Sequence, residues 1–369
     1  MLIEPGQRVV VAMSGGVDSS VCAGLLKERG CDVVGMTMQI WDYRNFESPA
    51  GNSFGTCCSL DDVYDARKVA DALDIPFYVV NFERHFEHAV IEKFCDDYFS
   101  GRTPNPCILC NQSLKFDILL RRARELQANY LVTGHYAQLV QHHNRYSLFK
   151  GLDTTKDQSY FLFTMTQEQM QYIRFPLGHL TKKMVREHAA RLNMPVAEKD
   201  ESQDICFVPD GNYVRFLEER CGHGTMDGDI IHVKGQVLGK HRGTYRFTIG
   251  QRRGLGLAWP EPLYVIAVDA EKKHVIVGER QYLYVKSCYL SKVNWIIDCP
   301  KISFEAKCRI RYRHTEVEAT IKPVKGDAAK IEFRNPQTAV TPGQALVIYD
   351  GEQVLGGGWI ESSVSETVG

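Results

Sequence analysis

The sequence lacks any long hydrophobic run: no stretch approaches the roughly 20 apolar residues of a membrane-spanning helix. The first residues, MLIEPGQR, have no apolar core behind a basic start, so neither a secretory leader nor a membrane anchor is expected and the location is predicted to be cytoplasmic. The sequence also lacks an excess of either charge, because 44 Lys and Arg are balanced by 45 Asp and Glu, which gives a formal net charge of −1. This balance excludes nucleic-acid binding through bulk charge and leaves room for local basic patches.

Cysteine, by contrast, is abundant. The 369 residues include 12 cysteines, and in a cytoplasmic protein these are not expected to form structural disulfides. Some of them are therefore expected to do chemistry or to bind a metal. The length favours two or three domains, and a hydrophobic content of 44% with 24% charged residues is that of an ordinary globular protein with a real core.

The most informative stretch runs from Val9 to Gly30, VVVAMSGGVDSSVCAGLLKERG. Its β-branched valines predict a buried strand, and Val21, Leu25 and Leu26 recur with the period of a helix that ends near Gly30. The two adjacent glycines between strand and helix let a ligand approach the backbone amides closely. Free N–H groups at the start of a helix, together with the helix dipole, make an anion site.

By itself, such a turn can equally be a tight strand-to-helix connection capped by Asp18 or Ser19. It lacks the Gly-Lys-Ser/Thr of a Walker loop and the third glycine of a dinucleotide fingerprint. SGGVDS resembles instead the pyrophosphate loop of the PP-loop ATP pyrophosphatases, which cleave ATP between its α and β phosphates and transfer AMP to a carbonyl oxygen. The resemblance implies that residues 14–19 hold the pyrophosphate.

Strands and helices alternate in the first half of the chain. Strands are predicted at 33–41, 77–80 and 130–136, a hairpin at 137–150, and helices at 61–73, 84–99, 111–127 and, capped by Thr181, 181–192. This rhythm predicts an α/β fold with a parallel, doubly wound, Rossmann-like sheet. Ligands bind at the carboxyl ends of such strands, where Ser14, Met38 and Gly134 all lie, so one nucleotide is expected to touch all three.

Beyond about residue 210 the character of the sequence changes. Glycines, turn signals and short alternating apolar segments replace the previous rhythm, and they predict a small antiparallel barrel toward the C-terminus. We expect domain boundaries at 1–209, 210–280 and 281–369. Arg309, Arg311 and Arg313 alternate in one predicted strand beside Tyr312, so they are expected to face one side, either as a phosphate-binding stripe or as a solvated sheet face.

Between the predicted helix at 84–99 and the strand at 130–136 lies a proline-rich loop, GRTPNPCILCNQSLKF. Its prolines hold the chain extended, and Cys107 and Cys110 form a Cys-x-x-Cys near a helix start, where the helix dipole lowers a thiol pKa. A zinc site would need two more ligands, for which Cys57 and Cys58 are poorly spaced. A thioredoxin-like motif would sit on another framework, and inert buried cysteines are a further alternative. We favour a reactive role.

Two further polar segments have more than one interpretation. The residues Lys156, Asp157 and Gln158 directly precede an aromatic run and are either a solvated turn or part of a site. Cys206 lies in an exposed acidic stretch, AEKDESQDICFVPDGNY, and is expected to be accessible.

Seven motifs occur in one order along nearly the whole chain: SGGVDS, GRTPNPCxxCN, TGHY, GLDxxKDQSYFL, SQDICF, TIGQRRGLG and TPGQ. This arrangement resembles the bacterial tRNA-specific 2-thiouridylases. The resemblance implies a PP-loop domain, a small central tRNA-binding domain and a C-terminal β-barrel. It implies replacement of the 2-oxo oxygen of the wobble uridine by sulfur in tRNAs for Lys, Glu and Gln. It further implies ATP with Mg²⁺, tRNA and a persulfide-carrying relay protein as partners, and a monomer.

The resemblance also assigns roles to residues. Cys110 matches the nucleophile and Cys206 the cysteine that carries sulfur as a persulfide. The positions that match ATP contacts are Ala12, Met13, Ser14, Gly15, Gly16, Val17, Asp18, Ser19, Met38 and Gly134. Those that match contacts to the target base or the tRNA are Asn105, Pro106, Cys107, Lys156, Asp157, Gln158, Arg311 and Tyr312.

One position departs from the pattern, because many members have Asp where this chain has Cys107. Together, Cys107, Cys110 and Cys206 offer three thiolates for a [4Fe–4S] cluster with one open iron. We favour the persulfide route, since the usual cysteine pair is intact. That route requires residues 195–210 to fold back over the site, and we predict that this loop moves and closes only when tRNA is bound.

Other function classes remain open on sequence. A different PP-loop ligase acting on a small substrate would have no use for paired loop cysteines or an appended barrel. A noncatalytic RNA-binding protein would not need an intact SGGVDS. A 4-thiouridine synthase would carry an added sulfurtransferase domain.

Overall fold

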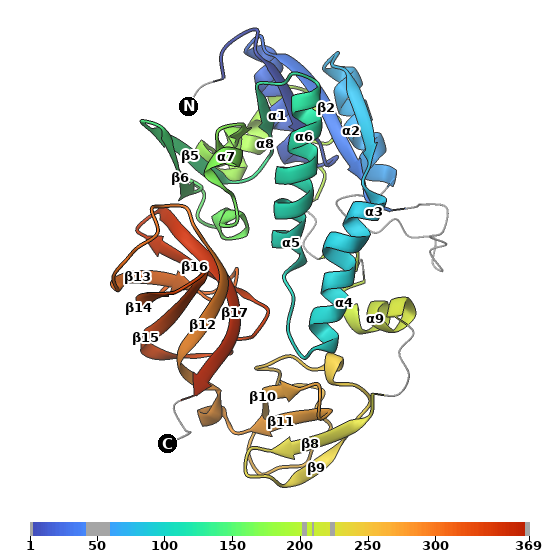
Figure 1. Ribbon diagram of the computed structural model, residues 1–369. Coiled ribbons are helices and arrows are strands. Elements are labelled where there is room, and N and C mark those ends of the chain that lie inside the picture. The colour runs from blue at the N-terminus through green and yellow to red at the C-terminus, as the bar shows by residue number, and fades with distance from the viewer. Residues whose placement is uncertain (1–2, 42–59, 201–204, 209, 222–225, 366–369) are drawn as a thin grey trace. The chain divides into compact units, whose positions relative to one another are not determined.

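The computed structural model describes residues 3–41, 60–200, 205–208, 210–221 and 226–365 (Figure 1). The chain separates into two compact units, which are described here one at a time. Unit 1 comprises Met1–Val90, Pro106–Asn212 and Glu352–Val354. Unit 2 comprises Ile91–Asn105, Tyr213–Gly351 and Leu355–Gly369. The predicted boundaries at 209/210 and 280/281 stay a prediction.

Unit 1 is built on a five-stranded sheet in the order β3-β2-β1-β4-β7, in which every neighbouring pair is parallel. The chain starts in the middle of this sheet, moves outward to β2 and β3, and then returns to the other side of β1 at β4. The strand order thus reverses beside β1, and doubly wound sheets bind their ligands at such a point. The strands are β1 Arg8–Ala12, β2 Asp32–Gln39, β3 Phe77–Asn81, β4 Tyr130–Val132 and β7 Ile173–Arg174.

The predicted parallel α/β sheet is therefore confirmed, with two differences in detail. Strand β4 ends at Val132, so residues 133–136 form the loop that follows it rather than part of the strand. Strand β7 was not predicted, because its two residues are too few to produce a period. The hairpin predicted at 137–150 is present as β5 Ala137–His142 and β6 Arg145–Lys150.

The helix predicted before Gly30 and those predicted at 61–73, 84–99, 111–127 and 181–192 are present, whereas the helices Gln167–Met170 and Tyr213–Cys221 were not predicted. One correction concerns the helix after the proline-rich loop, which begins at Pro106 rather than at residue 111, because proline fits the first turn, where its missing N–H would have no partner anyway. It continues as a π-helical segment, Cys110–Leu119, into α6. The α-helices are α1 Val17–Glu28, α2 Leu60–Ala72, α3 Glu83–Phe86, α4 Glu92–Phe99, α5 Pro106–Leu109, α6 Leu120–Glu125, α7 Gln167–Met170, α8 Lys182–Arg191 and α9 Tyr213–Cys221.

Helix α8 is fixed at both ends. At its start, the Thr181 hydroxyl accepts a hydrogen bond from the Met184 N–H (3.3 Å), which confirms the predicted cap. At its end, Arg191 forms a two-pronged ion pair with Glu28 of α1, with N–O distances of 2.6 and 2.8 Å. Val185 and Ala189 of α8 are fully buried in the same core as Val21 of α1. The first residue of α8, Lys182, is thereby held at a defined place.

Unit 2 contains two all-β parts. The first is a sheet in the order β10-β11-β8-β9, made of β8 Gly228–His232, β9 Val237–His241, β10 Tyr264–Asp269 and β11 His274–Gly278. The second is an antiparallel barrel in the order β12-β15-β14-β13-β16-β17, closed by pairing of β12 with β17. Its strands are β12 Tyr284–Trp295, β13 Phe304–Arg309, β14 Val317–Val324, β15 Ala328–Thr338, β16 Ala345–Asp350 and β17 Gln353–Ser365. The predicted C-terminal antiparallel barrel is confirmed.

The predicted stripe of alternating arginines is wrong. Strand β13 ends at Arg309, and Arg311 and Arg313 lie in the turn that follows, where the His314 N–H donates to the Arg311 carbonyl (3.0 Å). Arg309 is itself neutralised by Glu316 at 2.8 Å. The side-chain alternation of a strand therefore does not extend to the last two arginines, and only Arg311 and Arg313 are exposed.

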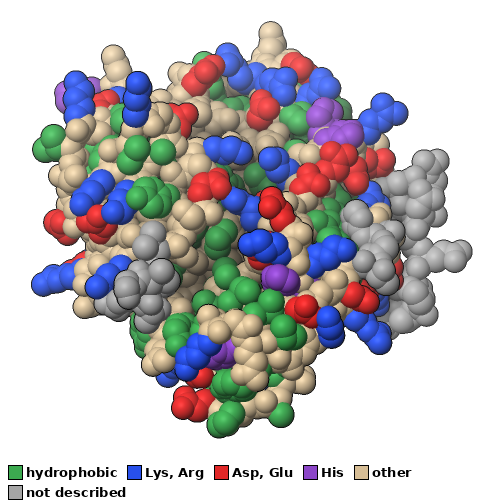
Figure 2. Space-filling model, turned by 60° about the horizontal axis from the view of Figure 1, so that its bottom comes forward, with side chains coloured by type: hydrophobic (Ala, Val, Ile, Leu, Met, Phe, Trp, Pro, Cys, Tyr) green, Lys and Arg blue, Asp and Glu red, His purple; other side chains and the backbone are tan. Residues whose placement is uncertain are grey.

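The surface of the protein carries both signs of charge. On the face drawn in Figure 2, Lys and Arg side chains are interspersed with Asp and Glu, as the net charge of −1 leads one to expect. In the parts of the chain that the structure covers, no helix is both long and apolar enough to cross a membrane.

Replacing Thr181 by Ala tests the cap of α8. The change leaves the Met184 N–H without its side-chain acceptor, and we expect the free energy of unfolding to fall by about 1 kcal/mol. Thr181→Ser keeps the hydroxyl and should stay close to wild type. Urea unfolding of the three proteins measures the difference, and equal losses in the Ala and Ser variants would contradict the role of the cap.

Candidate active site

The loop between β1 and α1 needs a glycine at position 15, both for its backbone conformation and for the space around it. Gly15 adopts φ +72°, and a Cβ there would lie 2.2 Å from the carbonyl oxygen of Asp62. Two serines fasten the turn from inside: the Ser19 hydroxyl accepts from the Ser14 N–H (3.2 Å), and the Ser20 hydroxyl donates to the Gly16 carbonyl (2.8 Å). The start of α1 is thus held open at the carboxyl end of β1, with no side chain at 15 or 16 to cover it.

A pocket of about 180 Å³ lies in front of this loop. It is lined by residues at the carboxyl ends of three neighbouring strands, so Ser14, Met38 and Gly134 share one cavity, as the position of the strand ends predicted. A Cβ on Gly134 would lie 3.0 Å from the Ser19 nitrogen, so the absence of a side chain keeps that amide reachable. The lining residues are Ala12, Met13, Ser14, Asp18, Ser19, Met36, Thr37, Met38, Lys115, Thr133, Gly134, His135 and Gln158.

Asp18, at the start of α1, is held by two side chains from later in the chain. Lys182 places its Nζ 2.8 and 2.9 Å from the two carboxylate oxygens, and the Tyr136 hydroxyl donates to Oδ1 at 2.8 Å. Together these contacts fix the carboxylate and balance its charge beside an anion site. Lys182 was not identified from sequence, where its only local signal is that it follows a predicted helix cap.

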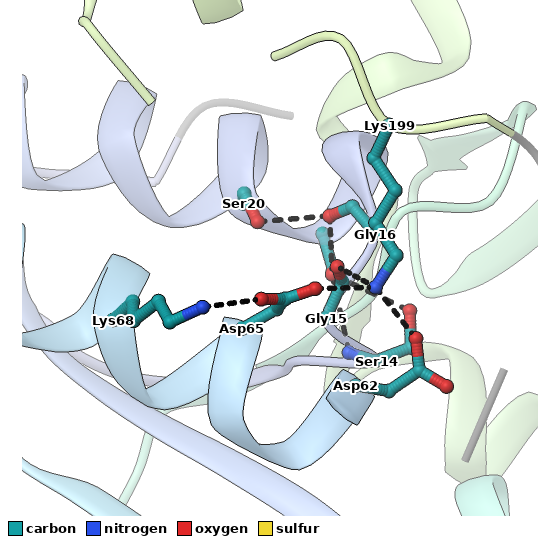
Figure 3. A network of polar contacts seen from close by, with 9 residues as sticks. Ser14, Gly15, Gly16, Ser20, Asp62, Asp65, Lys68 and Lys199 are labelled. Carbon is teal, nitrogen blue, oxygen red and sulfur yellow. Dashed lines mark hydrogen bonds and ion pairs between the residues drawn. The ribbon is translucent and has the colours of Figure 1, made fainter. Parts of the chain in front are cut away.

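A second lysine forms ion pairs with two carboxylates next to the same loop (Figure 3). Lys199 places its Nζ 2.7 Å from Asp62, 2.7 Å from Asp65 and 3.2 Å from the Gly15 carbonyl oxygen. Burial lowers the pKa of Lys199, but its hydrogen bonds to the two carboxylates outweigh burial and the net shift of the pKa is upward. Without this ammonium group, two carboxylates at the start of α2 would face the loop that is expected to bind phosphate.

His135 follows Gly134 and lines the pocket. Its ring is buried, and Nδ1 lies 2.7 Å from the Thr133 hydroxyl. Burial, and secondarily the charge of Lys115, hold the pKa of His135 well below its usual 6.5, so the ring is neutral at pH 7. Neither His135 nor Lys115 was named as a site residue from sequence, although the former lies within the TGHY motif.

The segment Lys156–Gln158 is built into the fold, which makes the solvated-turn interpretation wrong for Asp157. This carboxylate is 4% exposed and accepts hydrogen bonds from the Gly151 N–H (3.2 Å), the Ser159 N–H (3.0 Å) and the Ser159 hydroxyl (3.0 Å). Gln158 exchanges hydrogen bonds with the backbone of Tyr136 and lines the pocket. Asp157 therefore holds the loop in place, and a contact of its side chain with tRNA stays a prediction.

The cysteines singled out from sequence differ in exposure. Cys107 is exposed on α5, whereas Cys110 and Cys206 are half-buried. Phe207, next to Cys206, is anchored by Phe86 and Trp41 at ring-centre distances of 5.7 and 6.3 Å. Residues 201–204 and 209, and with them most of the loop that is predicted to move, lie outside the described residues, as do Cys57 and Cys58.

The three cysteines of the iron–sulfur alternative are not gathered at one point. Within the described ranges, no three His, Cys, Asp or Glu side chains lie close enough together to hold a metal ion. A [4Fe–4S] cluster on Cys107, Cys110 and Cys206 stays a prediction, because Cys206 belongs to the segment that is predicted to move, and no step of the chemistry below passes through one.

In unit 2, the TPGQ motif holds the start of the proline-rich loop. The Gln344 side chain donates to the carbonyl oxygens of Thr103 and Pro104, both at 3.0 Å, and the Thr103 N–H donates to the Pro342 carbonyl at 2.9 Å. These contacts fix the chain immediately before Asn105. Both motifs are recognisable in the sequence, but nothing near Gln344 indicates its role. Arg311 is exposed and Tyr312 half-buried in the turn after β13.

Lys199→Met tests the charge balance at the loop. With two carboxylates left facing the anion site, we expect ATP to bind at least about tenfold more weakly. Lys68→Met is the matched control, since Lys68 also contacts Asp65 (3.1 Å) but from the solvent side, and it should change ATP affinity less than about twofold. Calorimetric titration with ATP and Mg²⁺ measures both. Equal affinities for wild type and Lys199→Met would refute the argument.

The lowered pKa of His135 gives a testable pH dependence of stability. The unfolded chain takes up a proton on this residue near pH 6.5, whereas the folded protein does not, so stability falls as pH drops below that value, by up to about 1.4 kcal/mol per pH unit. Unfolding of wild type and His135→Asn between pH 7.5 and 5.5 should therefore show a shallower loss in the variant. Parallel curves would mean that His135 titrates normally in the fold.

Comparison with known proteins supports a single family along the chain. Residues 7–210 match the family described as "tRNA methyl transferase HUP domain", residues 214–279 the "tRNA methyl transferase PRC-barrel domain", and residues 285–360 the "Aminomethyltransferase beta-barrel domain". Relatives that match nearly the whole chain are named for thiolation of tRNA instead of methyl transfer.

Three of these relatives are each named "tRNA-specific 2-thiouridylase MnmA". The protein from Geobacter metallireducens is 55% identical over 98% of this chain and 98% of its own length. That from Geotalea uraniireducens is 56% identical over 97% and 96%, and that from Syntrophotalea carbinolica 52% identical over 97% and 99%. Identity at this level over nearly the whole length places the chain in the family of the tRNA-specific 2-thiouridylases.

Proposed function

We propose that this protein is an ATP-dependent tRNA-uridine 2-sulfurtransferase, which converts the wobble uridine of tRNAs for Lys, Glu and Gln to 2-thiouridine. The observation that carries the proposal is the pocket at the start of α1. It combines an open pyrophosphate-type loop with a balanced set of charges, in the unit that also holds Cys107, Cys110 and Cys206. A transferase of this kind, acting on tRNA, belongs in the cytoplasm.

The first step is adenylation. The 2-oxo carbon of uridine is a poor electrophile and oxide is a poor leaving group, so transfer of AMP from ATP to that oxygen prepares it for displacement. The amides at residues 14–19 and the dipole of α1 would hold the departing pyrophosphate. Met38 and Gly134 would shape the nucleoside end of the pocket, and Mg²⁺ would enter with the triphosphate.

The second step is sulfur transfer. The terminal sulfur of a Cys206 persulfide attacks C2 of the base, and AMP leaves with the original oxygen. The Cys110 thiolate then attacks the Cys206 sulfur, which breaks the sulfur–sulfur bond, releases 2-thiouridine and forms a Cys110–Cys206 disulfide. Alternatively, Cys110 first releases hydrosulfide, which attacks C2. In either order, two electrons from an external thiol reductant restore the cysteines.

The substrate would be recognised by groups in both units. Asn105, Pro106 and Cys107 are proposed to meet the target base, and Lys156, Asp157, Gln158, Arg311 and Tyr312 the rest of the tRNA. We further propose a PP-loop domain at 1–209, a tRNA-binding central domain at 210–280 and a barrel domain at 281–369. The enzyme is proposed to act as a monomer supplied by a persulfide-carrying relay protein. Residues 195–210 are proposed to close over the site when tRNA binds.

The descriptions of the matching families mention methyl transfer, and this chemistry is less well supported here. Methyl transfer needs no cleavage of ATP between its α and β phosphates and no pair of reactive cysteines. A PP-loop ligase of small substrates would turn over ATP without tRNA. A noncatalytic RNA-binding protein would release no pyrophosphate at all.

Nucleoside mass spectrometry tests the proposal directly. Unmodified tRNA is incubated with the protein, ATP, Mg²⁺, a thiol reductant and a persulfide donor. We expect 2-thiouridine with wild type and a loss of at least about a hundredfold with Cys206→Ser or Cys110→Ser, since each removes an obligatory nucleophile. Cys299→Ser, an exposed cysteine of unit 2, is the matched control and should stay active. Methylated uridine, or no modified base with any donor, would reject the assignment.

A further inference from the structure

A second, larger pocket lies at the opposite end of the parallel sheet in unit 1. Its volume is about 560 Å³, and its lining includes the first residue of β4, the residue before β7 and the last residue of that two-residue strand. Tyr130 is the first residue of β4, and Tyr172 directly precedes β7, where its carbonyl accepts a hydrogen bond from the Leu131 N–H (2.8 Å). None of the lining residues belongs to the ATP pocket: Arg124, Gln127, Ala128, Asn129, Tyr130, Gln141, Tyr146, Gln171, Tyr172 and Arg174.

The lining has a consistent chemistry. It contains three tyrosines, two arginines and four side-chain amides, and no Asp or Glu is among the described residues that line it. The guanidinium carbon of Arg124 lies 4.1 Å from the centre of the Tyr172 ring, and that of Arg174 lies 3.8 Å from the centre of the Tyr130 ring. Two stacked arginine–tyrosine pairs therefore present flat, positively charged surfaces.

The two pairs differ in how firmly they are held. Arg174 is 6% exposed, and one of its terminal nitrogens donates to the carbonyl oxygens of Met170, Gln171 and Ile173. Arg124 is exposed at the end of α6. The buried pair thus forms a rigid floor, whereas the exposed arginine can turn toward a ligand.

Gln127 occupies a position where the backbone conformation favours glycine over a residue with a side chain. It follows α6 with φ +57°, the left-handed region that favours glycine after a helix. A glutamine there is tolerated at a conformational cost that glycine would not have. Its amide lines the pocket and adds a donor and an acceptor for a hydrogen-bonding ligand.

We propose that this pocket binds a nucleotide, with its base stacked on an arginine–tyrosine pair and its phosphate facing Arg124. The edge of the base would be read by the amide of Gln127 and by the amide nitrogen of Asn129, whose oxygen accepts a hydrogen bond from the Arg8 N–H (3.1 Å). Aromatic rings and guanidinium planes are the surfaces on which proteins stack unpaired bases. A pocket with two cations and no carboxylate among its described lining residues suits an anion. The nucleotide comes either from a single-stranded segment of RNA or from the free pool. The site stands apart from the ATP pocket and does not depend on the thiolation chemistry.

Photocrosslinking tests the proposal on the full-length protein. A short single-stranded RNA that contains 5-iodouridine is irradiated with the protein, and the adducts are mapped by mass spectrometry of peptides. We expect crosslinks at Tyr130, Tyr146 or Tyr172. In parallel samples, excess uridine monophosphate or excess unlabelled RNA is added as a competitor. Loss of crosslinking with uridine monophosphate indicates a free-nucleotide site. Loss of crosslinking with unlabelled RNA alone indicates a site for an RNA segment. Absence of adducts in these peptides, with no binding of uridine monophosphate by calorimetry, overturns the proposal.

Matched variants separate the pocket from general charge effects. Arg124→Ala and Gln127→Gly are each expected to reduce crosslinking or nucleotide affinity at least about fivefold. Gln127→Gly relieves its backbone, so it should not weaken the fold. Arg121→Ala, which removes an exposed arginine paired with Asp117 (3.1 Å) outside the pocket, should change neither by more than about twofold. Equal losses in Arg121→Ala and Arg124→Ala would mean nonspecific attraction and would also overturn the proposal.

Discussion

The design of unit 1 depends on keeping negative charge away from the start of α1. A helix start attracts anions only if no fixed carboxylate competes for the same amides, yet this loop has Asp18 within it and Asp62 and Asp65 beside it. The protein meets this constraint by bringing an ammonium group to each side. Lys182 faces Asp18, and Lys199 faces the other two carboxylates. The loop thus combines a shape set by Gly15 with a local charge close to balance.

The same two lysines connect the loop to the later part of unit 1. Lys182 begins α8, which is packed on α1 through the buried core, and Lys199 lies on the segment that leads toward Cys206. Lys199 also donates to the Gly15 carbonyl, so the segment that carries Lys199 is directly hydrogen-bonded to the loop between β1 and α1. In unit 2, Gln344 plays a comparable role for the chain before Asn105. Contacts between distant motifs, rather than the motifs alone, therefore hold the reactive segments.

Much of the fold could be predicted from sequence, because local chemistry decides it. The valine run, the glycine pair and the helical period gave β1, the loop and α1, and the rule for parallel strands gave the meeting of Ser14, Met38 and Gly134. What could not be predicted depends on distant partners. Lys182 and Lys199 reach the loop from 164 and 184 residues away, and nothing near them in the sequence marks their role. Strand β13 ends at a turn, whereas the alternation of arginines predicted that the strand would continue.

The burial of cysteines has a consequence for how sulfur reaches this protein. Cys22, Cys31, Cys288 and Cys308 are buried, and burial is the main reason that their pKa values are raised, to about 12 for Cys288. At neutral pH these groups stay protonated and act as small hydrophobic side chains. Among the described cysteines, these four thereby do not compete for a sulfane-sulfur donor, whereas Cys107 and Cys299 are exposed. In the proposed persulfide route, selective loading then rests on silencing these buried thiols as well as on activating the correct one.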